Sequence, residues 1–144
     1  MKRTGLFFGV VVFAALVFAF AVYGQDIPIG FFAPITGPAA ADGASAKHSV
    51  ELGLKEVNDA GGIKGRKVNL IIYDDRLNPQ EAVAIANKLI EKDKVIGVVS
   101  GAYSGPTRVT APIFQKAGIP MVAGYAVHPD VTWDHSLKKP NDFC

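Results

Sequence analysis

Cysteine is nearly absent from this 144-residue sequence, which has one, Cys144, at its last position. One cysteine excludes an intrachain disulfide framework and a zinc site made of several thiolates. A surplus of basic charge is also missing. The net charge is +2, and without Lys2 and Arg3 the remaining 13 basic residues balance the 13 acidic ones. Because nucleic-acid binding needs a basic face to offset phosphates, the composition argues against a nucleic-acid partner.

Sequence motifs of common enzyme sites are missing as well. No G-x-G-x-x-G follows the first apolar run, and neither a phosphate-binding G-x4-G-K-[ST] nor a G-x-S-x-G nucleophile motif occurs. We therefore expect neither an enzyme nor a bound cofactor. Two sets of residues are candidate metal ligands: Asp74 with Asp75, and the group His128, Asp130, Asp134 and His135. Adjacent carboxylates more often cap turns, and the second group lies in a stretch without an expected scaffold, so we expect no metal site.

The first 24 residues have the pattern of a secretory signal. Five of the nine phenylalanines lie in the first 20 positions, and Gly5–Val22 carries no charge after the basic Lys2 and Arg3. A small residue, Gly24, closes the segment, which suits cleavage after it. The alternative is an uncleaved membrane anchor, because the apolar run is about long enough to span a bilayer. We favour cleavage and a body that works outside the cytoplasm.

The body alternates between predicted strands and helices. Apolar runs bounded by turn residues predict four strands, and apolar residues at helical spacing predict three helices between them. Asp42 is a candidate N-cap for the first helix, Asn78 caps the second with Glu81 able to reach back to it, and no element is expected in Val131–Cys144. The expected strands are Ile27–Ala33, Lys67–Tyr73, Val95–Val99 and Ile119–Ala123, and the third helix is Thr107–Ala117. This order predicts an α/β fold, a parallel sheet with helices on both faces.

A ligand is expected at the carboxyl ends of the strands, where such sheets bind small molecules. Three loops leave that edge: Pro34–Gly43, Ser100–Thr107 and Gly124–Pro129. In the second loop, hydroxyl groups including those of Ser104 and Thr107 lie beside a helix start, whose free N–H groups and dipole favour anions. This pattern suits a carboxylate, but simple helix capping explains the same residues equally well.

Several separate motifs follow one another along the body: Thr36-Gly37-Pro38, Gly61-Gly62-Ile63-Lys64-Gly65-Arg66-Lys67, Tyr73-Asp74-Asp75, Asn78-Pro79, Ala82 to Lys88 and Ala117-Gly118-Ile119-Pro120. Together they resemble one known family, the leucine/isoleucine/valine-binding proteins, which are type I periplasmic binding proteins that supply ABC importers. The resemblance covers about Ile27 to Thr132.

The resemblance implies two α/β lobes that close on a small solute, commonly an aliphatic amino acid, and a membrane permease as partner. It assigns the ligand's carboxylate to Ser104 and the ligand's ammonium to the backbone carbonyl of Tyr125. Residues 25–132 would form the N-terminal lobe, and residues 133–144 an irregular tail. The implied function is that of a periplasmic solute-binding component of an ABC importer. A membrane-anchored sensory domain of the same fold is the alternative.

Several positions depart from the family pattern. Val127 falls where a threonine often holds the head group of the amino acid, and valine cannot form that hydrogen bond. Asp42 falls on an aromatic wall of the pocket, where a carboxylate would favour a polar or cationic ligand. Leu77 and Tyr103 replace a cysteine pair seen in some members, so that Tyr103 is free to stack on the ligand.

The length also departs from the pattern. The second lobe and the later segments of the first lobe are missing from the sequence, so the sheet is expected to keep an unfinished edge. We therefore interpret the chain as the N-terminal part of a longer protein or a truncated gene product, which alone would bind ligand weakly or not at all.

Overall fold

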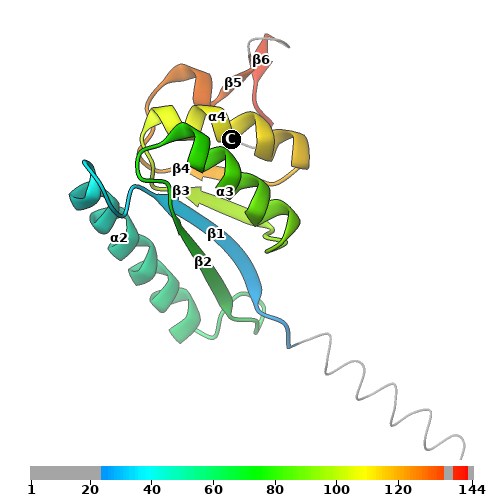
Figure 1. Ribbon diagram of the computed structural model, residues 1–144. Helices are drawn as coiled ribbons and strands as arrows, with labels where there is room; N and C mark the ends of the chain where they lie inside the picture. Colours follow the sequence, from blue (N-terminus) through cyan, green and yellow to red (C-terminus); the bar gives the residue numbers. More distant parts are fainter. Residues whose placement is uncertain (1–23, 135–137, 143–144) are drawn as a thin grey trace, which may run out of the picture.

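The computed structural model describes residues 24–134 and 138–142, which form one sheet with helices on both faces (Figure 1). Strands alternate with helices along the chain, as expected, up to the fourth strand. The elements are β1 (Ile27–Ala33), α2 (Ala40–Asp59), β2 (Val68–Asp74), α3 (Pro79–Glu91), β3 (Gly97–Ser100), α4 (Ser104–Ala117), β4 (Met121–Ala123), a 3-10 turn η1 (Pro129–Val131), β5 (Trp133–Asp134) and β6 (Lys139–Pro140).

The four-stranded sheet is parallel and has the order β2-β1-β3-β4. The strand order reverses at β1, because the chain moves to one side of it for β2 and to the other side for β3. In this arrangement, ligands bind where neighbouring connections diverge at the carboxyl ends of the strands. The predicted fold class is confirmed, and the reversal places the α2 and α4 starts at one edge.

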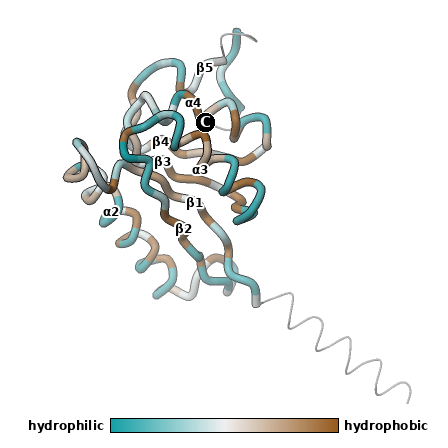
Figure 2. Tube along the Cα trace, viewed as in Figure 1, coloured by the Kyte–Doolittle hydropathy of each residue, from teal (hydrophilic) through white to brown (hydrophobic). Residues whose placement is uncertain are grey.

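The main core lies between the sheet and the helices α3 and α4. Phe32 of β1 and Phe114 of α4 are fully buried and stack with ring centroids 6.4 Å apart. Gly30 of β1 lies under Leu89 of α3, and a Cβ at Gly30 would come within 2.9 Å of both terminal carbons of that leucine. The small residue thus lets α3 pack closely on the sheet. In Figure 2 hydrophobic residues recur along β1, β2 and β3.

On the opposite face of the sheet α2 is the one helix within the described ranges, and it contacts β1 and β2. Only Gly43 of its 20 residues is buried. On the β4 half of this face Val122 is 64% exposed, and Val99 of β3 is half-buried. Within the described residues β4 pairs on one side only, so an edge and part of one face stay open, as the sequence predicts.

Two helices begin earlier than predicted. Helix α2 begins at Ala40, so Asp42 lies in its first turn and is not its N-cap. Helix α4 begins at Ser104, three residues before the predicted start at Thr107. Pro106 misled the prediction, because proline resembles a loop signal but is tolerated in the first helical turn, where its missing N–H would have no helical partner. Both shifts bring helix starts closer to the sheet edge.

The cap of α3 is confirmed, but its reciprocal contact is not seen. The Asn78 side chain accepts hydrogen bonds from the N–H groups of Gln80 and Glu81. Glu81 pairs with Arg76 at 3.0 Å and does not reach back, since the Asn78 N–H already donates to the Asp75 carbonyl.

The tail prediction was wrong in one respect. Trp133–Asp134 and Lys139–Pro140 pair as short antiparallel strands, although the sequence shows no periodicity there. Such two-residue strands are too short for a periodic pattern to be visible. In the part of the chain that the structure describes, no helix combines the length and apolar character needed to cross a bilayer. The predicted signal segment lies outside the described residues.

Candidate functional site

The carboxyl edge of the sheet brings together the residues predicted to bind a ligand. Ser104 is the first residue of α4, and its Oγ accepts a hydrogen bond from the Val127 N–H at 3.3 Å. This bond joins the β3–α4 loop to the loop after β4. The Val127 side chain is 92% exposed, so among the described residues it is hardly covered. Ser104 and Val127 therefore lie side by side at one open corner.

The start of α4 offers backbone donors at this corner. Pro106 has no N–H, and the Thr107 N–H donates to the Tyr103 carbonyl. The N–H groups of Ser104 and Gly105 make no hydrogen bond within residues 24–134 and 138–142. Tyr103 occupies the N-cap position without a side-chain cap. Unpaired amides at a helix start, together with the helix dipole, favour an anion such as a carboxylate.

Three further candidates form one cluster beside Ser104. The Tyr103 hydroxyl donates to Oδ2 of Asp42, which joins the first turns of α2 and α4. The rings of Tyr103 and Tyr125 meet edge to face with centroids 5.5 Å apart and an angle of 62° between their planes. Three loops thus converge here, as the fold predicts. The Asp42–Tyr103 contact was missed, because a pair 61 residues apart has no local sequence signal.

Thr107 lies apart from this open cluster. It is fully buried, and its Oγ1 lies 2.8 Å from the Ser100 Oγ and 3.3 Å from the Ala102 carbonyl oxygen. Its side chain turns toward the end of β3, where Ser100 and Ala102 enclose its hydroxyl group. In this conformation no solute reaches its hydroxyl. Its contacts fix the end of β3 to the start of α4, which positions Ser104.

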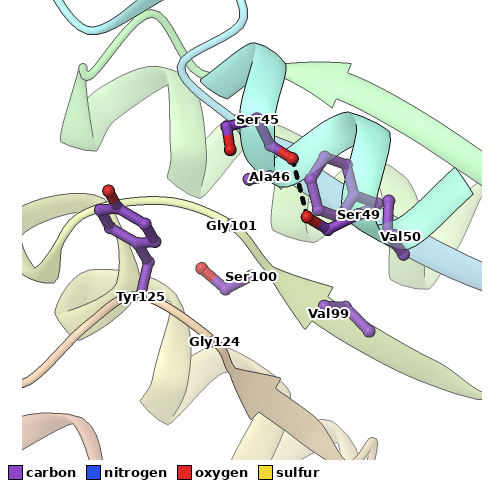
Figure 3. A pocket seen from close by; sticks show the side chains of 10 residues that line it. Ser45, Ala46, Ser49, Val50, Val99, Ser100, Gly101, Gly124 and Tyr125 are labelled. Carbon is purple, nitrogen blue, oxygen red and sulfur yellow. Dashed lines mark hydrogen bonds between the residues drawn. The ribbon is translucent and has the colours of Figure 1, made fainter. Parts of the chain in front are cut away.

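A cavity of about 360 Å³ adjoins the cluster on the α2 side of the sheet. Figure 3 shows Ser45, Ala46 and Ser49 of α2 opposite Ser100, Gly101 and Gly124, with Tyr125 at one end. Gly101 is required where β3 passes α2, since a Cβ there would lie 2.8 Å from the Phe31 ring and 2.9 Å from the Ala46 methyl. No local sequence signal marks the small residues of α2 as one wall of a cavity.

The two acidic residues after β2 serve the loops around the site. Asp74 Oδ1 accepts hydrogen bonds from the N–H groups of Ile35 and Arg76, and Oδ2 accepts from the Thr36 hydroxyl at 2.5 Å. Burial acts to raise the pKa of Asp74, but the bonds from Thr36, Arg76 and Ile35 outweigh it and hold the pKa below its ordinary value. Asp74 therefore fixes the loop that leads into α2.

Asp75 is different, because its carboxylate is buried with one oxygen unpartnered. Oδ1 accepts from the Leu77 N–H at 2.8 Å, whereas the buried Oδ2 has no hydrogen-bond partner among the residues that the structure describes. Burial raises the pKa of Asp75 to about 6, with smaller contributions from the nearby charges of Asp74 and Glu81. Among the described residues no three metal-ligating side chains lie close enough to hold an ion. His135 lies outside the described residues.

We expect Asp75 to make the protein less stable as pH rises. A carboxyl group whose pKa is raised in the folded state costs no stability below its ordinary pKa of 3.8. The cost grows as pH rises from 3.8 and is complete above about pH 6. The cost above that pH is on the order of 2–3 kcal/mol. The Asp75→Asn variant should therefore be more stable than the natural protein at pH 8, with a much smaller gain at pH 4.5. Urea unfolding at both pH values measures this.

Asp74→Asn is the matched control, with the opposite sign. The lowered pKa of Asp74 means that its charge stabilises the fold above the ordinary pKa and that this contribution is lost as pH falls. Asp74→Asn should destabilise the protein at pH 8. Equal losses from both variants at pH 8 would contradict the account of Asp75.

The parallel sheet and the helices on its two faces define an α/β lobe, and comparison with known proteins identifies the family. The family model described as periplasmic binding protein matches residues 26–143. The chain belongs to this family.

Curated relatives and solved structures agree. Leu/Ile/Val-binding protein homolog 3 of Brucella melitensis is 40% identical over 123 residues, which cover 85% of this chain and 33% of the relative. The leucine-, isoleucine-, valine-, threonine- and alanine-binding protein of Pseudomonas aeruginosa is 35% identical, over 83% of this chain and 33% of the relative. The crystal structure of LivJ from Streptococcus pneumoniae in complex with isoleucine superposes with a TM-score of 0.72 at 31% identity, covering 75% of this chain and 31% of LivJ. The chain thus spans about a third of the length of these relatives, which are solute-binding proteins.

Proposed function

We propose that this chain is the N-terminal lobe of the solute-binding component of an ABC importer, and that it binds a small carboxylate, such as a branched-chain or related amino acid. The observation that carries the proposal is the Ser104 corner, where a hydroxyl group and two unpaired helix-start amides meet at the open edge of the sheet. Charge-assisted hydrogen bonds of this kind contribute about 1.5–3 kcal/mol each. A second lobe would close over this edge, and a permease in the membrane would receive the solute.

Isothermal calorimetry on the complete gene product tests the proposal. A panel of amino acids, short-chain organic acids and amides separates the head groups: a ligand without a carboxylate should give no heat, and at least one carboxylate should bind. The relatives are named for binding leucine, isoleucine and valine, so these three amino acids are the first ligands to measure. A folded protein that binds no carboxylate would contradict the proposal.

A hydroxyl group at position 127 should strengthen the binding of amino acids. Val127 is 92% exposed beside Ser104 and offers no hydrogen bond from its side chain. In the Val127→Thr variant an added acceptor for the ligand's ammonium would contribute about 1 kcal/mol, or roughly fivefold in affinity. A carboxylate without an ammonium should show no gain, and calorimetry with leucine and its deaminated analogue distinguishes the two. A gain of equal size for both ligands would contradict the assigned role.

We propose that the protein is periplasmic and that residues 1–24 are removed during export. The uncharged Gly5–Val22 also fits an anchor, which would make the chain a membrane-held sensory domain. Intact-mass measurement of the exported protein separates the two. A species that begins at Gln25 supports the solute carrier, and one that retains Met1–Gly24 supports the sensor.

A further inference from the structure

Asp42 places an uncompensated negative charge beside the proposed carboxylate site. It is half-buried in the first turn of α2, and it forms no ion pair with any residue in the described ranges. Its Oδ2 accepts the Tyr103 hydroxyl, and Oδ1 makes no hydrogen bond within the same part of the chain. Because Tyr103 immediately precedes Ser104, the Asp42 carboxylate and the Ser104 corner lie at the same end of the sheet, next to each other.

Two tyrosine rings lie between these features. Tyr103 is 37% exposed and Tyr125 is 46% exposed, and they meet edge to face. Tyr125 lies two residues before Val127, whose N–H bonds to Ser104. Exposed tyrosine faces attract cations, and a carboxylate close to them adds a separate electrostatic attraction. The bond to Asp42 raises the pKa of Tyr103, so this hydroxyl stays a donor and holds the carboxylate in place at neutral pH.

The arrangement disfavours a purely aliphatic ligand. Asp42 repels the carboxylate of any ligand held at Ser104. An aliphatic side chain that removes water from Asp42 forms no hydrogen bond or ion pair with it, so the free-energy cost of desolvation is not offset. A ligand with a second positive group gains from Asp42 and from both rings. We propose that Asp42 and the Tyr103–Tyr125 pair select carboxylate ligands with a cationic side chain, such as basic amino acids, over the aliphatic amino acids. This inference rests on the proposed function.

Lysine and norleucine provide a matched pair of probes, because they share the α-carboxylate, the α-ammonium and a four-carbon side chain and differ by the terminal ammonium. Calorimetry on the complete gene product should show lysine binding at least about tenfold more tightly than norleucine. Asp42→Asn should remove most of this ratio by weakening lysine binding, and norleucine should bind as well or better. Tyr103→Phe, which keeps the ring and releases Asp42, should lower the ratio less than Asp42→Asn does.

Asp59→Asn is the control, because it removes a carboxylate at the other end of α2, where Asp59 pairs with Lys55. It should leave the ratio unchanged. Norleucine binding as tightly as lysine, or a ratio that survives Asp42→Asn in a variant with natural circular dichroism, would overturn this inference alone if Ser104 is still required. If no amino acid binds, or if binding is indifferent to Ser104, the proposed function fails and this inference fails with it.

Discussion

Replacing Ser104 with alanine is expected to weaken ligand binding by about ten- to a hundredfold, the loss of one charge-assisted hydrogen bond. The hydroxyl is at the first position of α4 and at the open corner, so its removal should leave the fold intact. Its contact with the Val127 N–H is long, at 3.3 Å, and contributes little to stability. Calorimetry on the complete gene product measures the loss, and the melting temperature checks the fold.

Thr132→Val serves as the control for Ser104→Ala. Thr132 is exposed, and its hydroxyl contacts only the Pro129 carbonyl at 3.4 Å among the described residues. Removing this hydroxyl should leave affinity unchanged. A Ser104→Ala variant that binds like the control would show that the ligand's carboxylate lies elsewhere.

The second large effect is expected on stability, at Gly43 in the first turn of α2. A Cβ at this position would lie 2.1 Å from the Pro34 carbonyl oxygen and 2.5 Å from its carbon. Backbone atoms cannot move aside as a side chain does, so Gly43→Ala must displace the start of α2 from β1. We expect a loss of about 3 kcal/mol in the free energy of unfolding, near the upper end for overpacked sites. Because Asp42 is the preceding residue, its contact with Tyr103 should weaken too.

Gly53→Ala tests the reason for this loss, because it makes the same change in the same helix. Nothing lies within 4 Å of a Cβ at Gly53. Alanine there should stabilise the protein by about 0.5–1 kcal/mol, since it restricts the unfolded chain and favours the helix. Urea unfolding of both variants should give opposite signs. Destabilisation by both would mean that glycine serves α2 through its flexibility and not through close packing at Gly43.

Local sequence signals predicted the elements well where the determining contacts are themselves local. Asn78-Pro79 marks the start of α3 correctly because an N-cap acts on N–H groups two and three residues away. The all-apolar run that includes Val98 and Val99 predicts a central strand of a parallel sheet, and β3 indeed pairs with β1 on one side and β4 on the other. The order of alternating elements then fixed the parallel topology.

The site was harder to predict because it depends on contacts between distant segments. The rule for open parallel sheets predicts that the loops containing Ser104 and Tyr125 leave the same end of the sheet, and in the structure two contacts join these loops, Ser104–Val127 and Tyr103–Tyr125. Thr107 belongs to the same predicted loop as Ser104, but its hydroxyl group is buried against Ser100. This contact forms only when the start of α4 packs on the end of β3. Asp42 was expected as a cap, and its bond to Tyr103 arises only when two helix starts are brought together.

A crystal structure of the complete gene product with its bound solute tests the central claim most directly. The account predicts the carboxylate of the solute within about 3 Å of Ser104 Oγ and of the Ser104 or Gly105 N–H. A solute bound away from the start of α4, or bound there through a group other than a carboxylate, would contradict it.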